Sequence, residues 1–324
     1  MTNETEKQFQ KIKYLLSEKK RVLVMAHENP DADAVGSMLA LSFLLEKMGH
    51  QVFLFSPDEL PEYLNFLPSF ESITNNLPLL ENVDLAFCLD YGDFKRLRFS
   101  DDFLEEKIIT IDHHLESTQK GIVKIIDSGY SSTAEIIYFL ANYLGLEIDK
   151  TIATCLLSGI LYDTGGLRHI STSPQTLKVV SDLLSKGLSL EDISQKILTS
   201  GKSLIDSKIW AEVLSRVVLD KKRKFVFSWV YFEDFNKYQI SISDLDGIAS
   251  LISTISDASF SLFLIESEKG KIKGSLRSEP HKAENIIGIA KALGGNGHSF
   301  AAGFKQEGSI EEVLQKVYNF IDNA

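Results

Sequence analysis

Cysteine is scarce in this sequence: Cys88 and Cys155 are its two cysteines among 324 residues, and both lie inside apolar runs. Two buried free thiols in a reducing compartment explain this usage better than a disulfide or a thiolate metal site does. The chain also lacks an apolar run of the ~18 residues that a membrane helix requires. Its polar N-terminus lacks the apolar segment of a secretory signal. These absences predict a cytoplasmic protein without a membrane partner.

Positive charge is also in short supply. The chain carries 34 lysines and arginines against 45 aspartates and glutamates, a formal net charge of −11. A protein that binds long nucleic acid by neutralising its phosphates needs basic stripes, so this balance argues against long polymers as partners. Small nucleotides stay possible, because bound divalent cations would supply positive charge locally.

The length of the chain favours two domains, and the order of the predicted elements divides it. Apolar strands alternate with helices over residues 1–187, which predicts an α/β domain with a parallel sheet covered by helices on both faces. Residues 188–218 have the pattern of a charged helical connector. Residues 219–324 combine alternating strands such as KFVFSWVYF with helices, which predicts a smaller mixed α/β domain.

Side chains that commonly bind metals cluster at the ends of strands in the first domain. In open parallel sheets, ligands bind beyond the carboxyl ends of the strands, where loops lead into helices. One strand is followed by AHENPDADAVGS, residues 26–37, two later strands end in CLD and TIDHH, and a helical run ends in YDTGG. The candidate ligands are His27, Asp31, Asp33, Asp90, Asp112, His113, His114 and Asp163.

Most of these residues have an ordinary structural alternative when taken alone. Asp31 or Asp33 is more often a helix cap than a ligand. Asp90 suits a turn, and Asp163, which precedes Thr-Gly-Gly, suits a helix C-terminus. The Asp-His-His run is harder to explain in this way, because desolvating three such groups at a strand end is costly unless something pairs with them.

Taken together, the candidates indicate a metal centre. Carboxylates mixed with imidazoles, without cysteine, suit Mn²⁺ or a similar divalent ion. The set exceeds what one ion usually takes, but it suits two ions ~3.5–4 Å apart that share a bridging carboxylate. Such a pair activates a water as hydroxide and neutralises a phosphoryl group during in-line displacement. The pattern therefore predicts a phosphoryl-transfer site.

The same residues carry a family resemblance. HENPDADAVGS, CLDYGD, IDHH and YDTGG resemble, in order, the four motifs of the DHH phosphoesterase superfamily, and GSLRS and GGNGHSFAAGF resemble its DHHA1 partner domain. The resemblance runs from about residue 22 to residue 304. The length and domain order are similar to the oligoribonuclease and pAp-phosphatase branch rather than to the larger exonucleases of the RecJ type. The resemblance implies an active site in the cleft between the two domains.

The resemblance also implies how the metal ligands are shared. His27 and Asp31 would bind the first ion, and Asp33 and Asp163 would bind the second. Asp90 would bridge both ions. This assignment accounts for four carboxylates and one imidazole in a single centre.

The DHH motif itself would divide its roles. His113 would complete the second metal site, and His114 would face the substrate, holding or protonating the scissile phosphate or the leaving oxygen. Asp112 would orient the neighbouring imidazoles from behind, as carboxylates near metal sites often do. The division of roles between His113 and His114 stays open at this point.

The second domain contributes candidates for substrate binding. Arg277, at a strand end, offers a planar fork for a phosphate. The glycine-rich loop, with Gly295, Asn296 and Gly297 followed by His298, would permit a tight turn that exposes backbone N–H groups as an anion-binding nest. An ordinary loop is the alternative. Many relatives have glycine at position 296, and asparagine tolerates the left-handed backbone that we expect there.

Four further residues of the first domain each have two alternative roles. Arg96, six residues after Asp90, would either reach the substrate or form a surface salt bridge. His169, in GLRHIST, would either line the cleft or serve the structure. Ser132 and Thr133 begin a helix, so capping is their expected role, with phosphate binding as the alternative.

These observations predict a metal-dependent phosphohydrolase for short RNA or DNA oligonucleotides and small adenine nucleotides. It would release 5′-mononucleotides from pApA-like substrates and dephosphorylate 3′-phosphoadenosine 5′-phosphate (pAp). A cyclic di-AMP phosphodiesterase is the alternative, since its motifs overlap. Pyrophosphatase and polyphosphatase relatives are less favoured, because the glycine-histidine loop indicates nucleotides. A noncatalytic nucleotide-binding regulator would lack a ligand, and none is missing. A homodimer is implied by the resemblance alone.

Overall fold

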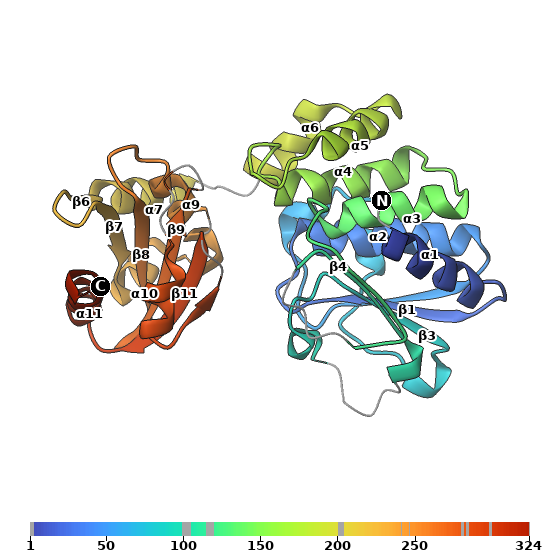
Figure 1. Ribbon diagram of the computed structural model, residues 1–324, viewed down its shortest axis with the longest axis horizontal. Coiled ribbons are helices and arrows are strands. Elements are labelled where there is room, and N and C mark those ends of the chain that lie inside the picture. The colour runs from blue at the N-terminus through green and yellow to red at the C-terminus, as the bar shows by residue number, and fades with distance from the viewer. Residues whose placement is uncertain are drawn as a thin grey trace. The chain divides into compact units, whose positions relative to one another are not determined.

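The protein is described here by a computed structural model, which divides the chain into two compact units, Met1–Gly201 and Lys202–Ala324. Each unit is considered by itself, and Figure 1 shows the course of the chain through both. No helix in the described part of the chain has the length and apolar character needed to cross a membrane. The structure describes residues 3–98, 105–114, 120–199, 204–240, 242–245, 247–279, 282, 285–297 and 300–323.

The first unit is built on a five-stranded sheet in the order β2-β1-β3-β4-β5, and every neighbouring pair is parallel. Every residue of β3 and β4 is buried, which explains why these strands are continuous apolar runs rather than alternating ones. The carboxyl ends of all five strands meet at one edge. The strands are Arg21–Ala26 (β1), Gln51–Phe55 (β2), Leu85–Leu89 (β3), Ile108–Asp112 (β4) and Val123–Ile126 (β5).

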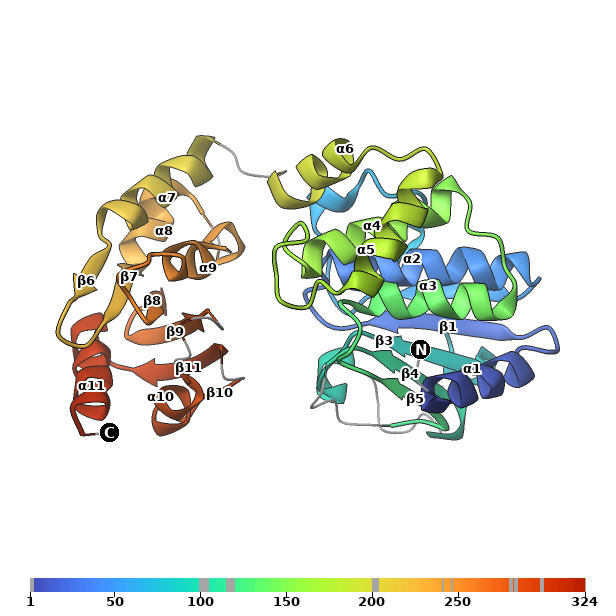
Figure 2. The ribbon, with the colours of Figure 1, turned by 45° about the horizontal axis from the view of Figure 1, so that its top comes forward.

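The α-helices of this unit gather on one face of the sheet. In Figure 2, α2 and α3 lie against the sheet, and α4 and α5 form a further layer. The helices expected within residues 1–187 are present, and the longer ones that follow β1 are α2, α3, α4 and α5. The helices are Asn3–Leu15 (α1), Ala32–Lys47 (α2), Thr133–Leu144 (α3), Lys150–Asp163 (α4), Pro174–Ser185 (α5) and Leu190–Ser194 (α6), followed by a π-helical turn, Gln195–Thr199.

The opposite face of the sheet corrects the prediction of helices on both sides. In the described residues, Met25 and Cys88 on this face pack against residues of loops and short 3₁₀ turns, such as Phe94. The connection between β2 and β3 holds four of the seven prolines of the chain, which prevents a long helix there because proline lacks the N–H that a helix needs. The functional edge of the sheet is therefore framed by helices from one side alone.

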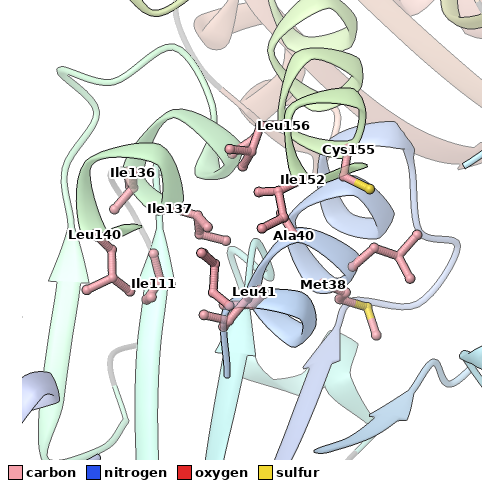
Figure 3. Packing of buried hydrophobic residues seen from close by; sticks show 14 of the residues in the cluster. Met38, Ala40, Leu41, Ile111, Ile136, Ile137, Leu140, Ile152, Cys155 and Leu156 are labelled. Atoms are coloured by element: carbon pink, nitrogen blue, oxygen red, sulfur yellow. The ribbon is translucent and has the colours of Figure 1, made fainter. Parts of the chain in front are cut away.

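Close packing of α2, α3 and α4 positions the loops at this edge. Figure 3 shows Leu41, Ile137 and Ile152 from these three helices gathered beside Ile111 of β4. A Cβ on Gly36 of α2 would lie 2.4 Å from the carbonyl oxygen of Cys155, so α2 and α4 approach as closely as their backbones allow.

The second unit has a mixed six-stranded sheet in the order β10-β11-β9-β8-β7-β6, in which β7 and β8 are parallel and all other pairs are antiparallel. Helices α10 and α11 cover one face, and α7, α8 and α9 cover the other. The predicted mixed α/β unit is confirmed. Its elements are Leu204–Ser215 (α7), Val218–Asp220 (β6), Phe225–Val230 (β7), Phe232–Tyr238 (α8), Ile248–Ser253 (α9), Phe260–Glu268 (β8), Lys271–Ser278 (β9), Ile287–Ala292 (α10), Asn296–Gly297 (β10), Ala301–Glu307 (β11) and Ile310–Asn323 (α11).

The segment 188–218, expected to be a connector, is divided between the two units. Ile193 and Ile197 join the core of the first unit. Ile209 and Val213 of α7 are buried in the second unit. Both helical stretches bury apolar side chains, and this burial assigns each of them to its neighbouring core.

Candidate metal centre

The loop after β1 places the first three candidates at the carboxyl edge of the sheet. Asp31 is the N-cap of α2, and its Oδ1 accepts from the backbone N–H groups of Asp33 and Ala34 at 2.9 and 3.0 Å. Its other oxygen, Oδ2, lies 3.9 Å from Nε2 of His27. Asp31 therefore caps the helix with one oxygen and keeps the other directed at the imidazole, so the two alternatives for this residue coexist.

Asp33 is fully buried and faces the start of α3. Its oxygens accept from the backbone N–H groups of Thr133 and Ala134 at 2.7 and 2.9 Å, so the positive end of a helix supports the carboxylate. A Cβ on Gly159 of α4 would lie 2.5 Å from Oδ1 of Asp33, which explains glycine at that position. Burial raises the pKa of Asp33 well above its usual range, and Asp163 raises it further.

Asp90 lies at the centre of the cluster. It follows β3 with a left-handed φ of 53°, which is uncommon for a residue other than glycine. Its Oδ2 is 3.7 Å from Nε2 of His27, and its Oδ1 is 3.5 Å from Nε2 of His113 and accepts from Oγ1 of Thr133 at 3.0 Å. Burial raises the pKa of Asp90 well above its usual range, and nearby carboxylates, first among them that of Asp33, add to this. The two oxygens thus face two different imidazoles, as a bridging ligand requires.

Asp112, the first residue of the DHH run, contacts Gly92 and His114 rather than the other candidate ligands. Asp112 is buried at the end of β4, and its oxygens accept from the backbone N–H of Gly92 at 2.8 Å and from the backbone N–H and the Nδ1 of His114 at 3.0 and 2.8 Å. Burial opposes ionisation of Asp112, but His114 outweighs it and lowers the pKa of this carboxyl. These contacts fit the orienting role that was expected of Asp112.

His113 and Asp163 form the other side of the centre. Nε2 of His113 is 2.9 Å from Oδ2 of Asp163, which closes α4 onto the end of β4. Burial lowers the pKa of His113, but the Asp163 carboxylate opposes this and the result is a pKa raised to about 9. His169 contacts the same region, with Nδ1 at 2.9 Å from the backbone oxygen of Asp163.

The candidate ligands form three overlapping groups whose ligand atoms lie within 4.8 Å of one another. The group with His27 and Asp31 has the ligands predicted for the first ion. The group with Asp33 and Asp163 has those predicted for the second ion, apart from the shared Asp90. Asp90 occurs in two of the three groups. Several buried carboxylates with raised pKa values repel one another, and bound cations would remove this cost, so the residues present fit divalent metal ions. The groups are His27–Asp31–Asp90, Asp33–His113–Asp163 and Asp90–His113–His114.

The two cysteines take no part in this centre. Both are free and buried, as predicted. Burial raises the pKa of the Cys88 thiol to about 12 and also raises that of Cys155, so neither provides a thiolate at neutral pH.

Arg96 lies against His27, and within the described residues it forms no salt bridge. Its Nη2 is 2.8 Å from Nδ1 of His27, and its Nη1 donates to the backbone oxygen of Tyr91 at 3.2 Å. The same Nδ1 lies 2.7 Å from the backbone oxygen of Glu28. One ring nitrogen either donates or accepts, so these two contacts exclude each other. A metal held at Nε2 would leave the proton on Nδ1, which would then donate to the backbone oxygen of Glu28, and Nη2 of Arg96 would lose this contact.

The glycine-rich loop of the second unit differs from the expected nest. The backbone N–H groups of Gly294 and Gly295 donate to the carbonyls of Lys291 and Ala290, so they end α10 and do not face a ligand. Asn296 has no left-handed backbone, because it pairs with Gly303 in β10.

The other candidates of the second unit have different outcomes. Gly297 is needed as glycine, since a Cβ there would lie 2.4 Å from Cα of Ala302. Arg277 occupies the penultimate position of β9, opposite Ala301. His298 lies outside the described residues.

Two contributions to the site were not predicted. Thr133 was expected to belong to a helix start and also holds Asp90 by its hydroxyl, a contact between residues 43 positions apart for which the sequence has no signal. Gly159 makes room for Asp33, and its position inside an apolar helix was the one available hint. The predicted cap is confirmed, because Ser132 Oγ accepts from the Glu135 N–H at 3.1 Å.

Fold and site together define a class, the hydrolases that act on phosphoester bonds at the carboxyl edge of a parallel sheet. Residues 21–160 match the family model described as DHH family, N-terminal domain, and residues 222–323 match the DHHA1 domain. The chain belongs to the DHH family, with a DHHA1 domain following the catalytic one.

Three relatives illustrate the range of this family. The bifunctional oligoribonuclease and PAP phosphatase NrnA of Thermus thermophilus is 30% identical over 94% of this chain and 91% of that protein. A probable manganese-dependent inorganic pyrophosphatase of Streptococcus thermophilus is 25% identical over 93% of this chain and 90% of that protein. The crystal structure of an exopolyphosphatase-related protein from Bacteroides fragilis has a TM-score of 0.88 at 26% identity and covers 98% of this chain and 96% of that chain.

Proposed function

We propose that this protein degrades very short oligonucleotides to 5′-mononucleotides and removes the 3′-phosphate of pAp. The observation that carries the proposal is the placement of Asp90, whose two oxygens face His27 and His113 from two separate ligand groups. The oligoribonuclease and PAP phosphatase that is 30% identical to this chain supports the choice of substrate.

Two divalent ions, Mn²⁺ by preference, are proposed as cofactors. His27 and Asp31 would hold one ion and Asp33, His113 and Asp163 the other, with Asp90 shared between them. When bound, such ions neutralise the phosphoryl oxygens and lower the pKa of a water. The mixture of carboxylate oxygen and imidazole nitrogen supports manganese, as does the name of the pyrophosphatase relative.

The remaining residues would act on the substrate. Asp112 accepts from Nδ1 of His114, so Nε2 is the ring nitrogen that remains for the substrate. The His114 side chain is 41% exposed. In its protonated form, that imidazole would donate to the leaving oxygen. Arg96, released from His27, and Arg277 of the second unit would contact phosphates, and the Gly295–Gly297 segment with His298 would contribute further substrate contacts.

A panel of substrates tests the proposal. The protein with Mn²⁺ is incubated separately with pApA, pAp, cyclic di-AMP and pyrophosphate, and the products are separated by chromatography. We expect AMP from both pApA and pAp, with little turnover of the other two. Faster turnover of cyclic di-AMP would favour the cyclic dinucleotide alternative, and faster release of phosphate from pyrophosphate would move the protein towards the pyrophosphatase relative. No hydrolysis of any of the four would leave a binding protein.

A further inference from the structure

A basic hollow of about 630 Å³ lies in the second unit, apart from the residues assigned so far. Lys221, Lys224 and Lys282 line it, and Asp257 is its one acidic lining residue. This local excess of positive charge contrasts with the net charge of −11 for the whole chain. A hollow of this kind suits an anionic group.

The lysines come from two segments: Lys221 and Lys224 lie on the turn between β6 and β7, and Lys282 follows β9. Lys224 ends the tight turn between β6 and β7 with a left-handed φ of 54°, and its carbonyl accepts from the Ser259 N–H at 2.6 Å at the start of β8. Nζ of Lys282 donates to the backbone oxygens of Ser253 and Ile255, each at 2.7 Å. The turn, the loop before β8 and the segment after β9 are thereby tied together around the hollow.

The charged side chains of the turn differ in their partners. Arg223 is neutralised by Asp220 and Asp322. Across the part of the chain that the structure describes, Lys221 and Lys224 have no acidic partner within ion-pair distance. The arginine therefore fixes the turn, while the two lysines keep their charge for a ligand.

The hollow lies at the same edge of the sheet as Arg277. Ser278, next to Arg277 at the end of β9, pairs with Phe260 at the start of β8. Phe260 in turn pairs with Phe225, which directly follows Lys224. Two steps between neighbouring strands separate β9 from β7, about 10 Å across the sheet.

We propose that this lysine pocket binds a phosphate of the substrate chain beyond the one that Arg277 contacts. The proposal rests on the proposed function, and it adds that the second unit senses chain length. Lysine binds phosphate as a point charge, without demanding a fixed orientation, which suits a flexible oligonucleotide. A substrate with one nucleoside, such as pAp, does not extend to the pocket, whereas an RNA of several nucleotides does.

The test compares Lys221→Gln and Lys224→Gln with a matched control, Lys222→Gln. Lys222 lies on the same exposed turn, and the control makes the same charge change without altering the lining of the hollow. The kcat and KM of the full-length protein with Mn²⁺ are measured for pAp and for a 5′-phosphorylated RNA pentamer. Binding of a fluorescent pentamer is measured in parallel by anisotropy in EDTA.

The expected result is a KM for the pentamer about two- to fivefold higher in each lining variant, as for an exposed ion pair. The slope of log KM against log salt should fall by about 0.7 for each lost phosphate contact. The values for pAp and those of Lys222→Gln should stay at the wild-type level. Equal effects in all three variants, or equal effects on pAp and pentamer, would overturn the proposal.

Two further arms separate the remaining outcomes. If the wild type hydrolyses neither substrate but its anisotropy with the pentamer depends on Lys221 and Lys224, the proposed function fails and the pocket stands. The other outcome is binding of inorganic phosphate that depends on these lysines, while binding of the pentamer is the same in the wild type and the variants. In that case the pocket is a site for free anions, and its role in sensing chain length is refuted.

Discussion

Asp90 combines features that are individually unfavourable: a left-handed backbone, complete burial and several neighbouring carboxylates. Such strain persists where the surrounding structure enforces it, and it commonly marks functional sites. The hydroxyl of Thr133 is one of the groups that enforce it, because it fixes the oxygen directed at His113. Groups that orient metal ligands in this way affect metal affinity although they do not touch the ion.

Thr133→Val should therefore weaken Mn²⁺ binding by about 10–100-fold, as loss of an orienting partner does elsewhere. Valine keeps the shape of threonine and the backbone N–H that donates to Asp33, so the helix start is preserved. Calorimetric titration with Mn²⁺ measures the effect, and Thr133→Ser, which keeps the hydroxyl, should bind like the wild type. Unchanged affinity in the valine variant would refute this role for Thr133.

The shared nitrogen of His27 leads to a prediction for Arg96. Because the proposed metal at Nε2 would leave the proton on Nδ1, which would donate to the backbone oxygen of Glu28, Arg96 is expected to leave His27 and bind substrate. Arg96→Ala should then raise KM by about tenfold or more, the cost of losing a charged hydrogen bond. Its affinity for Mn²⁺, measured in the absence of substrate, should be equal to or higher than that of the wild type. A clear loss of metal affinity would instead show that Arg96 holds His27 in place.

The residue types of the site could be predicted because motif positions and ligand chemistry are local properties of the sequence. The partners of those residues could not. Nothing near Asp90 in the sequence indicates Thr133, and glycines that end a helix have the same local pattern as glycines that form an anion nest. Gly295 shows this ambiguity, since its N–H serves α10.

At the scale of elements, the spacing of the proposed metal ligands depends on how closely α4 approaches α2 and α3. Gly159 controls this approach, because an added Cβ would lie 2.5 Å from Oδ1 of Asp33 and 2.8 Å from Cβ of Ala134. The Cβ of Ala134 cannot move without shifting α3, and a movement of the Asp33 carboxylate would break its hydrogen bonds from the N–H groups of Thr133 and Ala134. The contact links helix packing directly to the position of a metal ligand.

Gly159→Ala should accordingly destabilise the first unit by about 1–3 kcal/mol, the usual cost of overpacking. It should also weaken Mn²⁺ binding, because Asp33 is displaced. Denaturant unfolding and metal titration measure the two effects. Gly288→Ala is the matched control, since a Cβ there meets nothing closer than 3.7 Å. A Gly159→Ala protein as stable as this control would contradict the packing argument.

The start of α8 leads to a prediction about pH. Burial disfavours the Asp234 carboxylate, but the Arg216 guanidinium and the Tyr231 N–H outweigh it and lower the pKa of Asp234. Because the folded pKa is the lower one, this stabilisation is present above the unfolded pKa of about 3.9 and is lost as pH falls through the folded value.

Asp234→Asn should thus lower the unfolding free energy of the second unit at pH 7 by about 1–3 kcal/mol. The difference from the wild type should begin to shrink below about pH 4, where Asp234 of the unfolded chain takes up a proton, and it should vanish as pH falls through the lower folded pKa. Thermal unfolding of both proteins across this range measures it. A difference that stays constant down to pH 2 would show that the ionised carboxylate contributes nothing.

Helices and strands were predictable from their apolar periodicity, but their distribution over the sheet was not. The alternation of strands and helices suggested two covered faces, whereas the prolines between β2 and β3 replace helices by 3₁₀ turns on one of them. The connector was misjudged for a related reason. A charged helix such as α6 still buries an apolar side chain. Ile193 of α6 packs into the core of the first unit, and this contact assigns the helix to that unit.

At the scale of the whole molecule, the acidic charge and the two-unit division imply that metal ions stabilise one unit selectively. The three ligand groups lie within the first unit, where buried carboxylates repel one another until cations are bound. An ion present at 100 times its Kd adds about 2.7 kcal/mol to the stability of the unit that binds it. The second unit, whose lysine pocket is directed to anions, should gain nothing from Mn²⁺. Hydrogen exchange should therefore be slower with Mn²⁺ than in EDTA in β1, β3, β4 and the start of α3. In β7, β8 and β9 it should be the same under both conditions. Equal slowing in both units would place the metal, or its stabilising effect, outside the cluster around Asp90.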